Sequence, residues 1–389
     1  MHHGPEASML RFQTLLISIL LLATPAMGQE DDLPENTGIT AETAADATAH
    51  ATIEEPPRNY FIPIPVIYYT PETKLALGVS AAYIYRTGDA DPSSRPSTLG
   101  GIGIYTTKSQ ILFAVGGEHY WDQDRQKLAG GLSYQKFPND FFGLGNDTDP
   151  DFSEGYTDES SGIGIDYLRQ LWPRIHFGGG VTLGNSSITE TSDGDLLESG
   201  LVPGSKGGVV TGAGLAANYD SRENVGYPLR GGFHQVSWRL YSDALGGDFN
   251  LNSTSLDLRQ YLHLGGKSVL ALRGMGIMGG GNMPFQIMPA LGGDSLMRGY
   301  FAGRFRERKA VAAQAEARFY IWKRLGGAVF GAMGQVGQDY GDLAASRFHY
   351  SGGAGLRILL IEQEGMNLRM DFGFGEDQSG FYLGFGEVF

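Results

Sequence analysis

The chain has 389 residues, of which 59 are glycine and none is cysteine, and its formal net charge is −14. The absence of cysteine excludes disulfide frameworks, iron–sulfur clusters and thiol nucleophiles. The negative charge disfavours non-specific binding to nucleic acid, which requires clustered Lys and Arg. Glycine is about twice as frequent as in an average protein, and aromatic residues make up 11%. This composition is typical of a β-barrel.

The first residues carry the features of an export signal. An apolar run at 15–23 follows Arg11 and precedes a small-residue site that ends at Gly28. Such a run is too short to cross a bilayer as a helix, so the pattern predicts a secretory signal peptide over residues 1–28. Residues 29–58 are rich in Glu, Asp, Ala, Thr and Pro and carry almost no large apolar side chains. We therefore expect a disordered acidic linker there.

Residues 59–389 show the alternation of β-strands. In one segment Leu368, Met370, Phe372 and Phe374 are separated by polar residues or glycine, which is the period of two expected for a strand. Many segments run about 10–15 residues, the length that a tilted strand needs to cross a membrane. Backbone groups in lipid must all be paired, so the sheet must close. The sequence predicts an all-β fold, a 16-stranded antiparallel transmembrane β-barrel.

The sixteen expected strands and their connections support this prediction, because bacterial single-chain barrels have even strand numbers. The strand centres are Pro65, Val79, Ile102, Val115, Leu132, Ile165, Gly180, Leu215, Val236, Leu258, Ala271, Ala315, Phe330, Gly355, Met370 and Phe385. The short connections are 121–126, 171–174, 264–268, 322–325 and 361–366, and the long ones are 137–155, 189–207, 281–308 and 338–347. Short periplasmic turns and long outer loops are expected of an outer-membrane barrel.

The last strand carries an assembly pattern. Phe381, Leu383, Phe385 and Phe389 share one alternating register, and Glu387 breaks it at one position. Outer-membrane barrels are recognised for assembly by such a pattern. We therefore expect these four residues to form a C-terminal signal that is read by the barrel assembly machinery.

The first and last strands are predicted to form a weak seam. Pro63 and Pro65 confine the first strand to an edge or a seam, because proline cannot donate a ladder hydrogen bond. Gly380, Gly384 and Gly386 weaken the last strand.

Three segments carry motifs. They are KFPNDFFGLGNDT at 136–148, YDSRENVGYPLRG at 219–231 and LGGDSLMRGY at 291–300. Together they resemble the BamA/TamA family of outer-membrane barrels, the bacterial surface-antigen superfamily. The resemblance covers essentially all of residues 59–389. It marks Asp220, Arg222, Pro228 and Gly231 as the pattern of a periplasmic turn.

The resemblance also implies that the loop with Arg298, Gly299 and Tyr300 folds back into the lumen, where Arg298 pairs with acids on the inner wall. Glu316 matches the family's acid on the twelfth strand, and the alternation of its strand directs it inward. A guanidinium in a narrow lumen requires carboxylates, because a desolvated single charge is costly. The alternative is a solvated Arg298 in an outer loop.

One family acid is missing. The resemblance implies an Asp on the thirteenth strand, but Ala332 stands at that position. We expect this change to weaken the loop anchor, or to move it to another inward acid such as Asp371 or Asp257.

The sequence indicates no catalytic or metal site. Its histidines have no Ser/His motif beside them, so we expect no enzyme activity and no cofactor. Asp147, Asp149 and Asp151 are spaced somewhat like a calcium loop, but Phe152 stands where that loop requires glycine. We expect a solvated acidic loop instead.

The function expected from the resemblance is envelope biogenesis at the Gram-negative outer membrane, by insertion or translocation of proteins or lipids. Family members that insert proteins carry periplasmic POTRA domains, and residues 29–58 are too short and polar for one, so we expect a barrel-only member. The alternatives are a passive or gated diffusion pore, or a structural anchor. Expected partners are outer-membrane lipid, lipopolysaccharide, the assembly machinery during biogenesis and a second copy in a homodimer.

Overall fold

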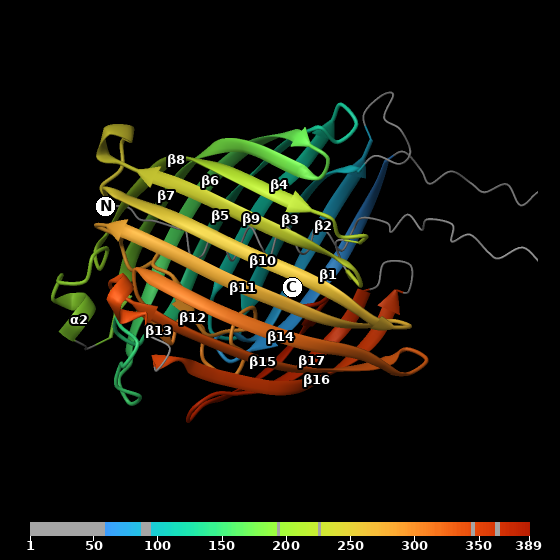
Figure 1. The fold of residues 1–389 in the computed structure, drawn as a ribbon. Helices are drawn as coiled ribbons and strands as arrows, with labels where there is room; N and C mark the ends of the chain where they lie inside the picture. Colours follow the sequence, from blue (N-terminus) through green and yellow to red (C-terminus); the bar gives the residue numbers. More distant parts are fainter. Residues whose placement is uncertain (1–58, 87–94, 193–194, 225–226, 344–346, 362–365) are drawn as a thin grey trace, which may run out of the picture.

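The computed structural model describes residues 59–86, 95–192, 195–224, 227–343, 347–361 and 366–389. The predicted signal peptide, 1–28, and the predicted linker, 29–58, lie outside these residues. In the described part, sixteen strands form one closed antiparallel barrel, so the predicted fold class is confirmed (Figure 1). No helix among the described residues is long and apolar enough to cross a membrane.

Each barrel strand pairs with its neighbours in the sequence, and β18 closes on β1. The barrel strands are β1 (Asn59–Thr70), β2 (Lys74–Tyr85), β3 (Ser97–Thr106), β4 (Ile111–Trp121), β5 (Gln126–Phe141), β6 (Glu154–Trp172), β7 (Ile175–Thr191), β8 (Gly207–Asp220), β9 (Gly231–Tyr241), β10 (Leu251–Gly265), β11 (Ser268–Gly281), β14 (Lys309–Trp322), β15 (Leu325–Gly337), β16 (His349–Ile361), β17 (Met366–Phe374) and β18 (Ser379–Phe385). A small sheet of β12 (Ala290–Leu291) and β13 (Phe305–Arg306) lies in the loop between β11 and β14. One short helix, α2 (Asp195–Glu198), follows β7.

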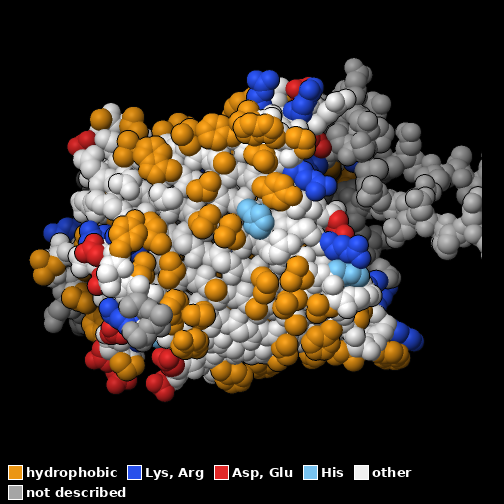
Figure 2. All heavy atoms as spheres, viewed as in Figure 1, with side chains coloured by type: hydrophobic (Ala, Val, Ile, Leu, Met, Phe, Trp, Pro, Cys, Tyr) orange, Lys and Arg blue, Asp and Glu red, His pale blue; other side chains and the backbone are white. Residues whose placement is uncertain are grey.

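The wall turns apolar side chains outward. The exposed fraction is 72% for Val79, 45% for Phe113 and 58% for Val181. Figure 2 shows apolar side chains spread over the visible outer face, while most charged side chains gather towards its two ends. This surface is that of a barrel whose wall faces lipid.

Three neighbouring strands are longer than predicted. β5, β6 and β7 have 16, 19 and 17 residues, so the predicted loops 137–155 and 189–207 begin and end inside strands. On β6 the outward positions are apolar at Ile163 and Ile165 but polar at Glu159 and Ser161. The three strands continue beyond the apolar band, because backbone pairing between strands does not require apolar side chains in the part of the barrel that lies outside the lipid.

The closure of the barrel depends on few pairs. β1 pairs with β2 along its whole length, from Asn59–Tyr85 to Thr70–Lys74. The register between β1 and β18 instead consists of the single pair Tyr69 and Leu383. This seam joins the first and last strands, as the sequence predicts.

Candidate functional site

The long loop 282–308 is anchored by Arg298. The side chain of Arg298 is 2% exposed, and it forms ion pairs with Glu316 of β14 and Asp371 of β17, both 0% exposed. Glu316 faces inward because β14 alternates between exposed apolar residues and buried polar ones. The structure thus places Arg298 among inward side chains, and the alternative of a solvated Arg298 is wrong.

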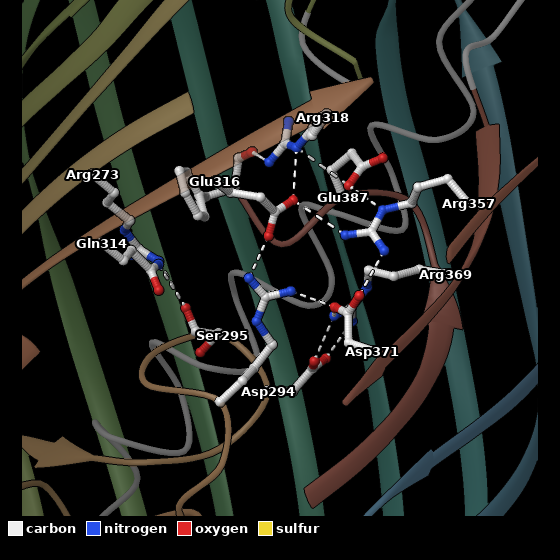
Figure 3. A network of polar contacts seen from close by, with 12 residues as sticks. Arg273, Asp294, Ser295, Gln314, Glu316, Arg318, Arg357, Arg369, Asp371 and Glu387 are labelled. Carbon is white, nitrogen blue, oxygen red and sulfur yellow. Dashed lines mark hydrogen bonds and ion pairs between the residues drawn. The ribbon is translucent and has the colours of Figure 1, made fainter. Parts of the chain in front are cut away.

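Glu316 is surrounded by three guanidinium groups. Besides Arg298, its Oε1 accepts a hydrogen bond from Nε of Arg318 at 2.8 Å and another from Nη2 of Arg357 at 3.2 Å. Arg318 stands two positions after Glu316 on β14, and Arg357 comes from β16 (Figure 3). Paired in this way, a carboxylate remains charged although it is buried.

Asp371 is the second acid that pairs with Arg298. Its Oδ1 accepts from Nη1 of Arg357 at 2.6 Å, and its Oδ2 accepts from Nη1 of Arg369 at 2.8 Å and from Arg298. The other candidate, Asp257, instead pairs with Arg259 and Arg273, both at distances below 3 Å.

A second charge on the loop is also fixed. Arg369 donates from Nη1 and Nη2 to the two carboxylate oxygens of Asp294, at 2.7 and 2.6 Å, a bidentate geometry that fixes orientation as well as position. The carbonyl of Ser295 accepts from Nε2 of Gln314 at 3.1 Å (Figure 3). The loop therefore has two ionic anchors, at Asp294 and at Arg298.

Close packing supports the Arg298 anchor. The guanidinium carbon lies 3.5 Å from the ring centroid of Phe330, a cation–π contact. Gly299 has φ 118°, and a Cβ on it would lie 2.5 Å from the carbonyl carbon of Phe374. A Cβ on Gly373 would lie 2.6 Å from the carbonyl carbon of Arg298. Glycine at both positions lets the loop backbone touch β17.

Tyr300 and the backbone beside it form hydrogen bonds with β18 and β16. The N–H of Gly299 donates to the hydroxyl of Tyr382 on β18 at 3.0 Å, and this hydroxyl donates to the carbonyl of Tyr300 at 3.3 Å. The hydroxyl of Tyr300 donates to the carbonyl of Tyr350 at 3.0 Å. The predicted residues Arg298, Gly299, Tyr300 and Glu316 are thus brought together.

The predicted turn motif lies at the other end of the barrel. Asp220 accepts from Nε and Nη2 of Arg222, each at 3.0 Å, and the Arg222 guanidinium lies 4.7 Å from the Phe233 ring. Gly231 has φ 90°, and a Cβ there would lie 2.1 Å from the carbonyl oxygen of Ser221. Pro228 lies between Arg222 and Gly231 in the same turn. These contacts give the motif a structural role in holding the turn between β8 and β9.

The predicted register of the last residues is wrong at Phe389. Phe381, Leu383 and Phe385 alternate with the buried residue Tyr382 on β18, but this strand ends at Phe385. Phe389 is 6% exposed and packs with residues of β10 and β11. The chain leaves the wall at Gly386, whose φ of 73° turns the backbone.

The cations around Glu316 and Asp371 were not predicted from the sequence as partners of these acids. We call the whole set the lumen charge network; its members are Arg298, Arg318, Arg357, Arg369, Asp294, Glu316, Asp371 and Glu387. The sequence did contain a signal for them, because polar and apolar residues alternate along these strands and the arginines occupy positions that face the lumen. Four cations face four anions, so the network is balanced. Its chemistry is that of a structural anchor, and no group of metal-binding side chains occurs among the described residues.

A closed antiparallel barrel with an arginine-anchored inner loop defines a class of outer-membrane-type β-barrels. Residues 98–389 match the model of the Omp85 superfamily domain, and the chain belongs to this superfamily. The resemblance to BamA and its relatives is thereby confirmed, and the described residues contain no POTRA-like domain.

Solved structures with the same fold are distant in sequence. BamA from Haemophilus ducreyi lacking POTRA domains 1–3 is 14% identical with a TM-score of 0.58, over 85% of this chain and 71% of that chain. CdiB from Acinetobacter baumannii is 12% identical with a TM-score of 0.56, over 85% and 60%. CdiB from Escherichia coli is 11% identical with a TM-score of 0.53, over 83% and 62%. The comparison with curated proteins finds no match.

Proposed function

We propose that this protein is exported to the Gram-negative outer membrane and assists the insertion or translocation of proteins there by opening the seam between β1 and β18. The observation that carries the proposal is the single registered pair, Tyr69 and Leu383. Every ladder hydrogen bond missing from a seam lowers the free energy needed to part its strands. A parted seam offers backbone donors and acceptors on which an incoming strand can pair.

The composition of both strands supports this proposal. Pro63 and Pro65 are two positions apart on β1, so their backbone nitrogens point towards the same neighbouring strand. Because proline has no N–H, that strand loses two hydrogen-bond donors. β1 is paired with β2 throughout, and we infer that the missing donors lie on the β18 side. In β18, Gly380 and Gly384 have no side chains to pack across the seam. The assembly machinery, outer-membrane lipid and lipopolysaccharide remain proposed partners, and catalysis has no part in the proposal.

The alternative is a diffusion pore. The lumen charge network joins β14, β16 and β17 on one side of the barrel, and loop 282–308 reaches the turn between β1 and β2, because the N–H of Ala302 donates to Oε1 of Glu72 at 2.6 Å. The loop therefore occupies part of the interior, which opposes a wide permanent channel. We therefore expect only low or transient conductance in planar bilayers. Large steady currents would favour the pore.

The direct test is assisted folding. An unfolded outer-membrane barrel would be added to liposomes with or without the purified protein, and its folded fraction would be followed by heat-modifiability on gels. We expect faster folding with the protein. Equal rates with empty and loaded liposomes would refute an insertion function.

A further inference from the structure

The chain beyond β18 occupies a defined site inside the barrel. After Gly386, whose N–H donates to the carbonyl of Asn367 at 2.8 Å, residues 387–389 continue inward. In Figure 1 the C-terminal label falls over β10 and β11, in agreement with the packing of Phe389. The segment thus extends from β18 towards strands that are not its neighbours in the sheet.

The site has an anion-binding part. The carboxylate of Glu387 is 2% exposed. Its Oε2 accepts from Nε of Arg357 at 2.9 Å and lies 3.3 Å from Nε of Arg318, while its Oε1 accepts from Nδ2 of Asn367 at 2.8 Å. Figure 3 shows Glu387 pointing at these two arginines. Without Glu387 the lumen charge network has four cations and three anions, so one buried guanidinium charge is left uncompensated.

The site also has an aromatic part. The ring of Phe389 lies 5.4 Å from the guanidinium carbon of Arg318, and its carbonyl oxygen accepts from Nη2 of Arg318 at 2.7 Å. The ring packs in an apolar cluster whose buried members are Tyr261, Val269 and Ala271. Leu229, from the turn between β8 and β9, packs against the same cluster. Arg318 thus contacts both parts of the segment.

We propose that this part of the lumen is a peptide-binding site, selective for an acidic residue followed two positions later by an aromatic residue, and that residues 386–389 fill it in cis. The acidic residue is required because it balances the positive charge of the lumen charge network. The aromatic residue is required because its ring fills the apolar cluster next to Arg318. When β18 separates from β1, the segment can leave with it, and the site then accepts a segment of the same chemistry from another chain.

The exchange of segments rests on the proposed opening of the seam, but peptide binding to the purified barrel is measured without any client or insertion assay, so failure of the site and failure of the proposed function can be told apart. The host is the variant Glu387→Ala/Phe389→Ala, which changes no strand residue and removes the two side chains that fill the site. Its folding is checked by heat-modifiability. The probe is the fluorescent tetrapeptide Gly-Glu-Val-Phe, with Gly-Gln-Val-Phe and Gly-Glu-Val-Ala as matched controls. A barrel shortened after Phe385 provides a second host.

We expect the variant barrel to bind Gly-Glu-Val-Phe about tenfold or more tightly than either control peptide, and about tenfold or more tightly than the unmodified barrel does, because its own segment competes. Failure of both folded hosts to bind the peptide would overturn the proposal. Equal binding of all three peptides would also overturn it, because the acid and the aromatic would then carry no selectivity.

Discussion

The anchor of loop 282–308 predicts a specific coupling between Arg298 and Glu316. Removing one member of a buried pair costs about 3–5 kcal/mol when the survivor is left alone. Here Glu316 keeps Arg318 and Arg357, and Arg298 keeps Asp371. We therefore expect about half of that cost, ~2 kcal/mol, from Arg298→Ala or from Glu316→Ala alone. Each single change leaves one uncompensated charge in the network.

The double variant restores the balance, with three cations and three anions. We expect Arg298→Ala/Glu316→Ala to cost ~1–2 kcal/mol less than the sum of the single changes. The assay is urea unfolding in detergent micelles, followed by heat-modifiability. Asp166→Asn is the control partner, because Asp166 pairs with Arg239 on another part of the wall; its effect should add to that of Arg298→Ala. Additive effects of Arg298 and Glu316 would refute this reasoning.

Three further predictions concern packing, lipid contact and export. Gly299→Ala should expose loop 282–308 to protease, because its Cβ would meet β17, whereas Gly274→Ala, whose Cβ has open space, should not; equal cleavage would contradict the packing. Ile165→Arg should destabilise the membrane-inserted barrel by about 2–4 kcal/mol and Ser161→Arg by much less, because only the former faces the apolar band; equal unfolding midpoints would show that the band is misplaced. Mass spectrometry of the exported protein should find it cut after about Gly28, and an uncut chain in the outer membrane would disprove the signal.

Strand alternation could predict the wall and part of the site. It assigns Glu316 to the inner face from its own strand, because polar and apolar residues alternate from Ala313 to Phe319 of β14. The alternation along its own strand also directs Asp371 inward, so Asp371 could be predicted as a substitute for the acid that is missing at Ala332. The acid that pairs with Arg298 is decided by distances inside the lumen. The alternation of residues along a single strand gives no information about these distances.

The path of the last residues could not be predicted from alternation. A strand pattern assumes that the backbone stays extended, but Gly386 adopts φ 73° and turns the chain. Glu387, which interrupts the outward apolar register, was the one available sign of this turn. A carboxylate that faces lipid is costly. The chain therefore turns inward, where Glu387 pairs with Arg318 and Arg357 and Phe389 is buried as well.

The central proposal is that the seam must open, and an engineered disulfide across it gives the most direct test. Tyr69→Cys/Leu383→Cys joins the one registered pair of the seam, and Leu132→Cys/Ile163→Cys joins a pair on the wall strands β5 and β6, away from the seam. The chain has no cysteine of its own, so no other disulfide can form.

Folding of an unfolded barrel would be measured in liposomes that contain each oxidised variant, before and after reduction. The proposal predicts that the oxidised seam variant loses the acceleration and regains it with reductant, while the wall variant is active in both states. Full activity of the oxidised seam variant would contradict the proposal, because insertion would then proceed through a closed seam.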